Sequence, residues 1–452
     1  MEAILLEKIR SAADAKKEKV FQIEKTIWDN PETGYREWKT SAYLQGLYRE
    51  MDFTPVPAGN IPGFYCDLDT GKPGPMIALI GELDAILCPE HPSADPATGA
   101  VHACGHHAQS AALAGAASVL KDPEILERLS GKIRFISVPA EELIEIEYRE
   151  ELRKKGTIRY FGGKVEFLYR GFFDGVSAVV MLHTGGGRKS FSLSPGSLGC
   201  LLKKIEFTGK ASHAGATPHL GINALYAANM ALNAINSIRE TFRDEDHIRV
   251  HPIITTAPGA VNVIPGRVTM ESYVRGATLQ AIKAANRQVN RALAGAAASM
   301  GASVMISDRP GYMPLDNDRN LYTLSKKIMT SIAGDENVRE RGQVDKGSTD
   351  MGDISCVIPS IHPSGSGAKG TGHGINYVID DPYSACLLAA EYLAAAAASL
   401  LENNALEALR VSAERKLKFN SFQDYFNAID SLNADCDAVG YHDDGSITIK
   451  LP

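Results

Sequence analysis

The sequence lacks an excess of positive charge. Its 452 residues include 47 lysines and arginines against 54 aspartates and glutamates, which gives a formal net charge of −7 at pH 7. Proteins that bind a polyanion such as nucleic acid usually gather their basic residues into a patch or stripe. No such stripe is present in this sequence, so we expect no nucleic-acid partner.

Long apolar runs are also missing. The N-terminal MEAILLEKIRSAADAKKEK has one short apolar patch followed by charges at helical spacing, which predicts that there is no signal peptide. The longest apolar candidate, ACLLAAEYLAAAAASLL, is interrupted by Glu391. A membrane span needs roughly 18 or more apolar residues, so this segment indicates a buried helix and we expect no membrane partner.

Cysteine is too sparse for a disulfide framework. Seven cysteines, an odd number, are scattered over the chain, whereas disulfide frameworks use an even number in small secreted domains. Together with the missing signal peptide, this pattern favours a reducing compartment, and we expect a cytoplasmic protein. Internal repeats and low-complexity segments are absent from the sequence as well.

The order of helix and strand patterns predicts an α/β domain at the start of the chain. The length exceeds what one ordinary core supports, so two domains are expected. Residues 1–197 alternate amphipathic helices with apolar strand segments such as PMIALIG and KIRFISV. This alternation is typical of a mostly parallel sheet flanked by helices.

A second pattern occupies residues 198–309. It reads as strand, helix, two strands, helix and strand, and the link APGAVNVIPG joins its two middle strands. This βαββαβ order is that of a ferredoxin-like unit, which is complete in itself. We therefore expect an inserted domain, with the α/β domain resuming at residues 310–452 and ending in a C-terminal extension. In that extension, Asp444-Gly445 predicts a hairpin turn.

Side chains of the types that bind metals gather where the predicted strands of the α/β domain end. IALIGELDAI ends at Glu82 and Asp84, FISVPAEE at Glu141 and Glu142, and AVVMLHT at His183, while HACGHH opens a helix. In open α/β sheets, ligands collect at the carboxyl ends of the strands. These four segments therefore predict one shared site.

The residue types at this predicted site suggest metal-assisted hydrolysis. Cys104 and His106 lie two residues apart just before a helix, so both side chains can turn to one side. Thiolate and imidazole suit zinc or cobalt, and a carboxylate also admits manganese. Of the adjacent Glu141 and Glu142, one can bind an ion while the other takes a proton from the water that the ion polarises.

Nucleophilic catalysis is an alternative chemistry for the same residues. Cys104 could be a nucleophile, with His106 or His107 as its base. Against this interpretation, a base two or three residues away rarely meets a nucleophile in line, and the paired glutamates would have no role. The other cysteines and the isolated histidines are interpreted as buried hydrophobes and surface residues.

Taken in order, the motifs carry a resemblance to a known family. GELDAI, HACGHH, PAEE, VMLHT, GKASHAGATPHLGINAL, NVIPG, SYVRG, GSTDMGD and GTGHG follow one another along the chain. In this the sequence resembles the amidohydrolase branch of the dinuclear metallopeptidases, which includes aminoacylases, carboxypeptidase G-type enzymes, indole-acetyl-amino-acid hydrolases and aminobenzoyl-glutamate hydrolases. The segment GSTDMGDIS is most similar to the last group.

The resemblance implies an activity and a set of site residues. It implies hydrolysis of an amide bond in an N-acyl-amino acid, an aminobenzoyl-glutamate-like compound or a small peptide. It implies Glu141 as the general base and Asp84 as a carboxylate that orients the site. For two divalent ions (Zn, Mn or Co), the implied ligands are Cys104, His106, Glu142, His183 and His373.

The resemblance also identifies the inserted unit as a lid and dimerisation domain. His213 of SHAG would reach the partner subunit's site in a homodimer and stabilise the oxyanion. Asn262 of NVIP would hold the substrate carbonyl, and Arg275 of YVRG its free carboxylate, which an arginine fork binds bidentately. Without the resemblance, these three residues would be interpreted as a cap, a turn and a surface charge.

The chain departs from the family pattern next to the cysteine. His107 stands where the family usually has aspartate, Gln109 replaces the next histidine, and the segment after PAEE is longer and more charged. His102 and His107 could be hydrogen-bond partners of the ligands, or His107 an additional ligand. The same departures motivate an alternative function, a non-catalytic subunit that binds an amino acid or peptide through a degraded metal site.

Overall fold

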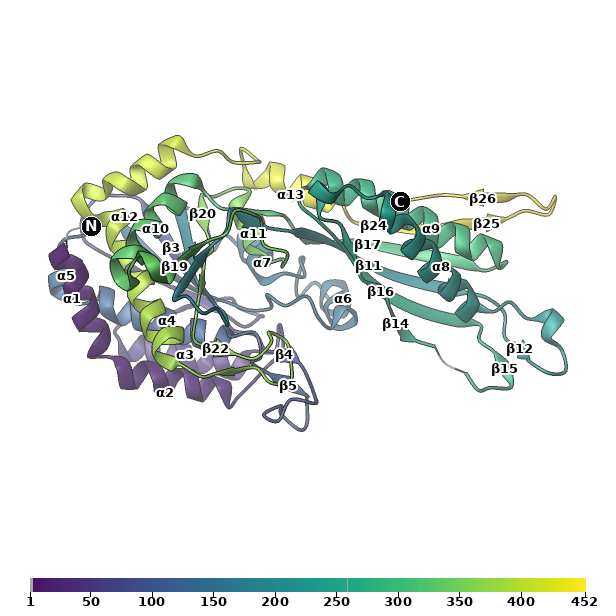
Figure 1. The fold of residues 1–452 in the computed structure, drawn as a ribbon, viewed down its shortest axis with the longest axis horizontal. Helices are drawn as coiled ribbons and strands as arrows, with labels where there is room; N and C mark the ends of the chain where they lie inside the picture. The colour runs from purple at the N-terminus through teal and green to yellow at the C-terminus, as the bar shows by residue number, and fades with distance from the viewer. Residues whose placement is uncertain (1–2, 258) are drawn as a thin grey trace. The chain divides into compact units, whose positions relative to one another are not determined.

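The computed structural model describes residues 3–257 and 259–452 (Figure 1). The chain forms two compact units. The first unit contains the chain up to Gly196, Leu315–Asp345 and Asp350–Asn420, and the second contains Ser197–Pro314, Lys346–Thr349 and Ser421–Pro452.

This division corrects the expected domain boundaries toward the C-terminus. The inserted unit extends to Pro314 rather than residue 309, and residues 421–452 belong to it rather than to the α/β unit. The reason is strand pairing: β24 (Ala434–Asp437) pairs antiparallel with β17 (Ser303–Tyr312), and so covers hydrogen-bonding groups that an edge strand would leave open. Beyond it, β25 (Val439–Tyr441) and β26 (Ile447–Ile449) form the expected hairpin.

A six-stranded mixed sheet forms the centre of the first unit. Its order is β1 (Val56–Pro57), β2 (Phe64–Asp69), β6 (Lys132–Val138), β3 (Met76–Glu82), β7 (Val176–Met181) and β20 (Ser360–Ile361). The strands from β6 to β20 run parallel, and β1 and β2 are antiparallel to their neighbours. Apart from its first residue, β3 is buried throughout, as expected for a central parallel strand.

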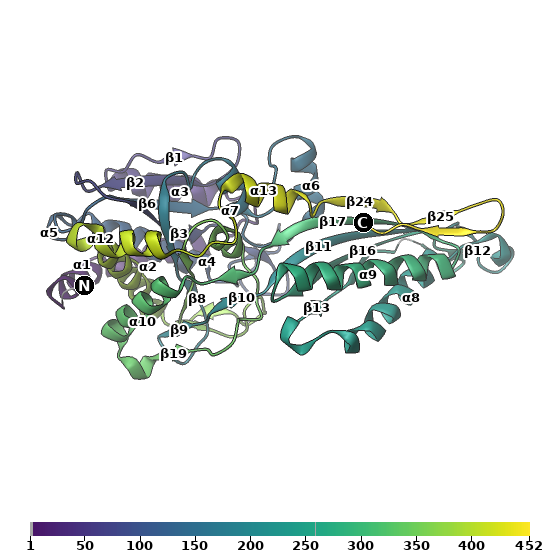
Figure 2. The same ribbon diagram turned by 90° about the horizontal axis from the view of Figure 1, so that it is seen from above.

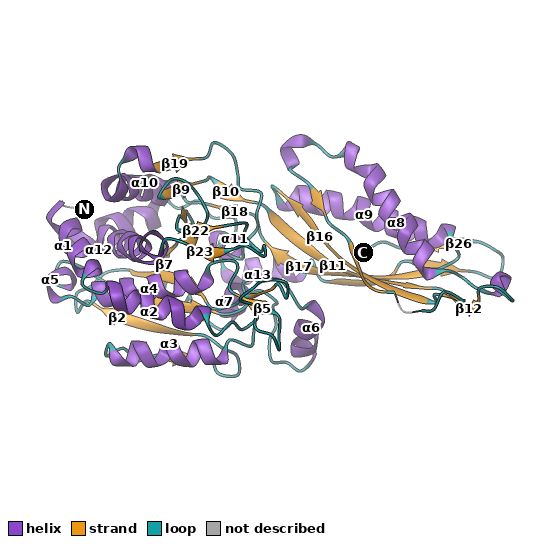
Figure 3. Cartoon of the chain, turned by 60° about the horizontal axis from the view of Figure 1, so that its bottom comes forward, coloured by secondary structure: helices purple, strands orange, loops and turns teal. Residues whose placement is uncertain are grey.

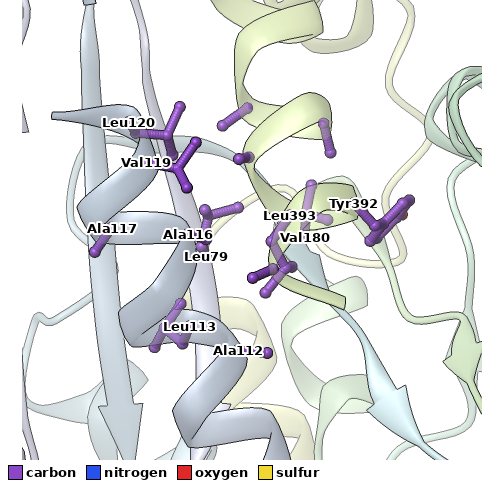
Figure 4. Close-up of a cluster of buried hydrophobic side chains, with 14 of the residues drawn as sticks. Leu79, Ala112, Leu113, Ala116, Ala117, Val119, Leu120, Val180, Tyr392 and Leu393 are labelled. Atoms are coloured by element: carbon purple, nitrogen blue, oxygen red, sulfur yellow. The ribbon is translucent and has the colours of Figure 1, made fainter. Parts of the chain in front are cut away.

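Small residues let helices pack closely on this sheet. In α4 (His106–Leu120), every residue except Ser118 is buried, and the helix packs against β3, α2 (Lys17–Trp28) and α12 (Leu388–Glu414). Figure 4 shows Leu113 and Ala116 of α4 near Leu79, Val180 and Leu393 in this core. The helix therefore begins at the predicted ligand segment and is held by the core along its length.

Of the described residues, only Tyr383–Glu414 forms a helix that is long and apolar enough, by length and composition, to cross a membrane. In its most apolar window, 94% of the residues are buried inside the fold. Its backbone leaves the helical conformation between Glu402 and Ala405. The apolar composition is thus accounted for by core packing, as the sequence predicts.

The second unit is an antiparallel sheet with two helices on one face (Figure 2). Its strand order is β13 (Arg249–Val250), β16 (Arg267–Gly276), β11 (Gly199–Thr208), β17 and β24, and β14 (Ile253–Thr256) also pairs with β16. Buried and less buried residues alternate along β16, so one face carries the apolar side chains. That face packs against α8 (Ala224–Ile238) and α9 (Leu279–Ser299).

The remaining α-helices and strands complete the two units, and Figure 3 distinguishes helices, strands and loops. The other helices are α1 (Ala3–Asp14), α3 (Trp38–Glu50), α5 (Pro123–Leu126), α6 (Ile146–Lys154), α7 (Gly163–Tyr169), α10 (Arg319–Ala333), α11 (Met351–Ser355) and α13 (Phe422–Asp430). The other strands are β4 (Ile86–Leu87), β5 (Ala100–Val101), β8 (His183–Thr184), β9 (Phe191–Leu193), β10 (Gly196–Ser197), β12 (Ser212–His213), β15 (Val263–Ile264), β18 (Leu315–Asp316), β19 (Val338–Glu340), β21 (Ser364–Gly365), β22 (Ala368–Lys369) and β23 (Val378–Ile379).

Candidate metal centre

The predicted ligand segments meet at one edge of the first unit's sheet. Glu82 is the last residue of β3 and Asp84 follows it, Glu141 and Glu142 come shortly after β6, and His183 comes shortly after β7. These three strands are parallel neighbours, so their carboxyl ends lie side by side.

A first group of ligand atoms forms around the start of α4. The ligand atoms of Cys104, His106 and His183 all lie within 4.8 Å of one another, and Cys104 Sγ is 3.5 Å from His183 Nε2. Between the first two lies Gly105, whose φ is 96°. A Cβ at this position would come within 2.5 Å of the Tyr377 hydroxyl. The turn before the helix therefore requires glycine, for its left-handed backbone and for the space.

A second group shares the same sulfur. The ligand atoms of Cys104, Glu142 and His373 also lie within 4.8 Å of one another, and His373 Nε2 is 2.9 Å from Glu142 Oε1. The backbone N–H of His373 donates to Ala103 O at 2.8 Å, which ties this late segment to the cysteine segment. Thiolate, imidazole and carboxylate donors fit two divalent ions that share Cys104.

Hydrogen bonds fix which histidine nitrogens face the centre. His106 donates from Nδ1 to the Asp84 carbonyl at 2.9 Å, with Asp84 Oδ1 at 3.2 Å, and His183 donates from Nδ1 to the Thr184 carbonyl at 2.8 Å. In both rings Nε2 is then the nitrogen left for an ion. The second oxygen of Asp84 accepts from the Glu142 N–H at 2.8 Å. Asp84 thus joins a ligand of the first group to a ligand of the second.

Electrostatics favour the ligand forms of these groups. Burial opposes ionisation of Cys104, but the neighbouring His106 and His183 lower the pKa of its thiol to about 6. Burial likewise opposes ionisation of Glu142, but the hydrogen bond from His373 lowers the pKa of that carboxyl to about 2. Thiolate and carboxylate are the forms that bind metal ions.

Glu141 lies beside His106 of the first group and differs from the ligands in its protonation. Its side chain is buried, and its carboxylate lies within 4.8 Å of the ligand atoms of Glu82 and His106. Burial, together with the charges of Glu82 and Glu142, raises the pKa of Glu141 well above its usual range. A carboxyl group with a raised pKa is suited to accept a proton and release it again.

Sequence reasoning missed a buried ion-pair network beneath the centre. Lys164 Nζ lies 2.5 Å from Glu82 Oε1 and 2.5 Å from Asp350 Oδ1, and all three side chains are fully buried. Burial opposes the charge on Glu82, but Lys164 and His106 hold the pKa of its carboxyl below its usual range. Glu82 and Asp350 occur in the motifs GELDAI and GSTDMGD, whereas nothing in the sequence distinguishes Lys164 from a surface lysine.

His107 faces away from the ligand groups. Its Nε2 is 3.2 Å from Glu24 Oε1. Its ring centroid is 5.0 Å from that of Trp28 and 5.2 Å from that of His102. Within residues 3–257 and 259–452, His107 belongs to none of the three groups that could hold an ion. The possibility that it is an additional ligand therefore finds no support in the geometry.

His213, Asn262 and Arg275, which the resemblance assigns to oxyanion stabilisation and substrate binding, all lie in the second unit. His213 is exposed on β12, where its Nδ1 accepts from the N–H groups of Gly215 and Ala216 at 3.1 and 2.9 Å. The adjacent β15 pairs with β12, and the Asn262 carbonyl accepts from the Ala214 N–H at 2.9 Å. The structure thus brings His213 and Asn262 onto one small ribbon.

Arg275 occupies a different position in the second unit. It lies near the end of β16, opposite Cys200 of β11 and Arg249 of β13. Its Nη1 donates to Ser348 Oγ at 3.1 Å, and its guanidinium lies 5.3 Å from the Tyr273 ring centroid. Ser348 belongs to the segment GSTD, so this motif places one residue beside Arg275 and another, Asp350, beside Lys164.

Known proteins similar to this chain include two curated hydrolases. IAA-amino acid hydrolase ILR1-like 4 of Arabidopsis thaliana is 28% identical over 357 residues, 75% of this chain and 74% of that protein. One of the p-aminobenzoyl-glutamate hydrolase subunits of Escherichia coli (strain K12) is 29% identical over 301 residues, 64% of this chain and 57% of that protein.

A similar solved structure and a match to a protein family agree with these sequence similarities. A crystal structure of a Bacillus subtilis protein, described as a dinuclear metal-binding peptidase of the M20 family, covers 86% of this chain and 99% of its own, with a TM-score of 0.63 and 21% identity. Residues 78–399 match peptidase family M20/M25/M40, and this range includes every predicted metal ligand. The chain therefore belongs to peptidase family M20/M25/M40, as one of its metallopeptidase-type amidohydrolases.

Proposed function

We propose that this protein hydrolyses an amide bond in an N-acyl-amino acid, an aminobenzoyl-glutamate-like compound or a small peptide. The observation that carries the proposal is the pair of ligand groups that share Cys104, with the buried Glu141 carboxylate close to His106 of the first group. The substrate class is supported by the relatives, whose names describe hydrolases of amino-acid and glutamate conjugates.

In the proposed mechanism the residues have distinct tasks. When bound, two divalent ions (Zn, Mn or Co) would supply Lewis acidity toward a water molecule and the substrate carbonyl. Glu141 accepts the proton of the attacking water and later returns it to the leaving amine. Asp84 keeps His106 in the tautomer that presents Nε2 and holds the backbone of Glu142 in place.

Substrate recognition is proposed to involve the second unit. Arg275 offers a guanidinium for the free carboxylate of the substrate, and Asn262 offers a side-chain amide for its carbonyl. His213 is proposed to stabilise the oxyanion in the site of the partner subunit, so the functional form is a homodimer. Its exposed ring, held through Nδ1 by two backbone N–H groups, leaves Nε2 available for this task.

Substitution of the proposed base tests the function. Purified protein loaded with Mn²⁺, Zn²⁺ or Co²⁺ is assayed on a panel of N-acyl-amino acids, aminobenzoyl-glutamate and dipeptides. Because Glu141→Gln removes the proton acceptor, we expect kcat to fall by about 10²–10⁴-fold. The control Glu151→Gln changes an exposed carboxylate on α6 and leaves kcat unchanged.

Two results would count against the proposal. Full activity of Glu141→Gln would remove the assigned base. The second result is that no divalent ion binds under any loading condition and that no substrate of the panel is cleaved. The alternative of a non-catalytic binding subunit predicts this result.

A further inference from the structure

The residue before the two adjacent glutamates has an unusual backbone conformation. Ala140 is buried and has a φ of 56°, in the left-handed region that residues with a Cβ rarely adopt. Such conformations persist only where the surrounding structure holds them, and they cluster at functional sites. Because Glu141 and Glu142 follow directly, the backbone at Ala140 determines where both carboxylates point.

Two buried charged residues bind both backbone groups of Ala140. Glu37 Oε1 accepts from the Ala140 N–H at 2.7 Å, and Arg149 Nη1 donates to the Ala140 carbonyl at 3.3 Å. The same carbonyl accepts from the Gly163 N–H at 3.1 Å. The side chains of Glu37 and Arg149 are both buried. These contacts hold Ala140 in the left-handed conformation.

Arg149 binds two more carbonyls of the same region. Its Nη1 donates to the Phe161 carbonyl at 2.6 Å, and its Nη2 donates to the Glu142 carbonyl. Within residues 3–257 and 259–452, no carboxylate forms an ion pair with this arginine. A buried cation without a carboxylate partner is costly, and apolar side chains would fill the same space at lower cost. The guanidinium, a planar fork of donors, is suited to fix several carbonyls at once.

The segment after α2 leaves room for this guanidinium. At Gly34, a Cβ would come within 2.5 Å of Arg149 Nη2. The ring centroid of Tyr35 lies 5.5 Å from the guanidinium, and the Tyr35 hydroxyl donates to the Tyr160 carbonyl at 2.9 Å. Glu37 comes from the same segment. One short stretch of chain therefore provides both the space for Arg149 and the acceptor for the Ala140 N–H.

We propose that Arg149 is a positioning residue for the proposed amide hydrolysis. Together with Glu37, it holds the backbone of Ala140 in the left-handed conformation. It thereby fixes the directions in which the carboxylates of Glu141, the proposed base, and Glu142, the proposed ligand, leave the loop. The charged segment after PAEE, which departs from the family pattern, then belongs to the catalytic apparatus. The inference rests on the proposed function.

Substitution of Arg149 tests the positioning role through kinetics. On a substrate that the wild type cleaves, at saturating metal, we expect Arg149→Met to lower kcat by about 10–100-fold because the base is misplaced. KM stays within about twofold, because Arg149 does not touch the substrate. Arg149→Lys keeps the cation but not the fork, and its kcat falls by about tenfold.

Metal binding gives a second measurement that does not depend on activity. Arg149 holds the backbone of Glu142, a ligand of the second group. We therefore expect Arg149→Met to weaken the binding of one of the two ions by about 10–100-fold. Metal content after dialysis of the protein against graded chelator concentrations measures the change.

A double variant tests the connection to Ala140. Glycine adopts a positive φ without steric cost. Arg149→Met/Ala140→Gly is therefore expected to recover about tenfold in kcat relative to Arg149→Met alone. A role of Arg149 in stability alone predicts no such recovery, because the added glycine would not restore the lost packing.

Arg134→Met is the matched control. It removes another buried arginine of the first unit, which binds the Asp67 carboxylate and the Phe172 carbonyl. We expect this variant to have a lower free energy of unfolding while the folded protein keeps the wild-type kcat and metal content. If Arg149→Met does not fold, Arg149→Lys provides the test, because it retains the buried charge.

The outcomes for this inference and for the proposed function differ. If wild type cleaves a substrate and the folded Arg149 variants keep its kcat and metal affinity, the positioning role is overturned while the proposed function stands. A kcat that falls only in proportion to the folded fraction, measured by circular dichroism, also overturns it. If wild type cleaves no substrate under any metal loading, the proposed function fails and the positioning role fails with it.

Discussion

At the scale of single residues, the centre depends on side chains that serve two partners. Cys104 belongs to both ligand groups, and Asp84 contacts His106 with one oxygen and the Glu142 backbone with the other. Partners of this kind orient metal ligands, and their loss typically weakens metal affinity by about 10–100-fold.

Asp84→Asn is expected to weaken the binding of both ions by about 10–100-fold. The amide keeps the shape of the side chain but cannot accept hydrogen bonds with both of its terminal atoms, so either His106 or Glu142 loses its support. Metal content after dialysis against a graded series of chelator concentrations measures the change. The control Asp52→Asn alters an exposed carboxylate whose side chain is 93% exposed. Retention of wild-type metal content by Asp84→Asn would contradict the role of Asp84.

His107 makes the stability of the folded protein depend on pH. Burial, reinforced by the charge of His106, lowers the pKa of His107 to about 3 from the usual 6.5. Below pH 6.5 the unfolded chain gains a proton here that the folded chain does not, so stability falls as the pH decreases toward 3, by up to about 1.4 kcal/mol per pH unit.

We therefore expect His107→Asn to flatten the loss of stability between about pH 6 and pH 4. Urea unfolding at several pH values, in chelator to keep both proteins metal-free, measures the slope. His219→Asn, which changes an exposed histidine, should keep the wild-type slope. An unchanged slope in His107→Asn would show that this imidazole is protonated in the folded protein.

At the scale of elements, α6 and α7 pack against the loop that carries Glu141 and Glu142. α7 begins against the loop that carries Glu141 and Glu142, and the buried Arg149 of α6 donates to the carbonyls of Ala140 and Phe161 in the same region. The charged segment after PAEE, which departs from the family pattern, thus folds into two helices that support the proposed base, Glu141, and the proposed ligand, Glu142.

Gly163→Ala is expected to destabilise the protein by about 2 kcal/mol or more, because the added methyl group would overlap the Pro139 carbonyl oxygen and overpacking typically costs about 1–3 kcal/mol. Gly46→Ala in α3 is the matched control, since a Cβ there meets no atom within 4 Å. It should stabilise the helix by about 0.4–1 kcal/mol. Chemical unfolding measures both; equal effects would mean that α7 can move without cost.

The elements also show how far sequence reasoning reaches. Strand ends, the glycine turn before α4 and the paired glutamates follow local patterns, so the convergence of Cys104, His106 and Glu142 could be predicted from residues and resemblance together. Lys164 could not, because its burial arises from tertiary packing of α7 against residues far away in sequence. The same holds for β24, whose pairing with β17 joins segments that are far apart along the chain.

At the scale of the whole molecule, the second unit carries exposed apolar side chains. Ile253 on β14 and Tyr226 on α8 are each 59% exposed, and Met230 on α8 is 45% exposed. β14 pairs only with β16 among the described strands, so its outer side offers unpaired backbone groups. Such a surface is suited to the proposed homodimer.

Sedimentation velocity tests the proposed dimer. We expect wild type to sediment as a dimer, and Ile253→Lys to shift the population toward monomer because it places a charge at the edge strand. Ile4→Lys, at an exposed position on α1 of the first unit, keeps the wild-type behaviour. A wild-type protein that is monomeric at all concentrations would remove the role proposed for His213 across subunits.

The sulfur common to both ligand groups has a chemical consequence. An oxidant such as hydrogen peroxide that converts the Cys104 thiolate to a sulfenic acid would strip a donor from both halves of the centre in a single event. Oxidation of Cys104 should therefore release the two cations together rather than one after the other. A thiol reductant should restore the binding of both cations at the same moment.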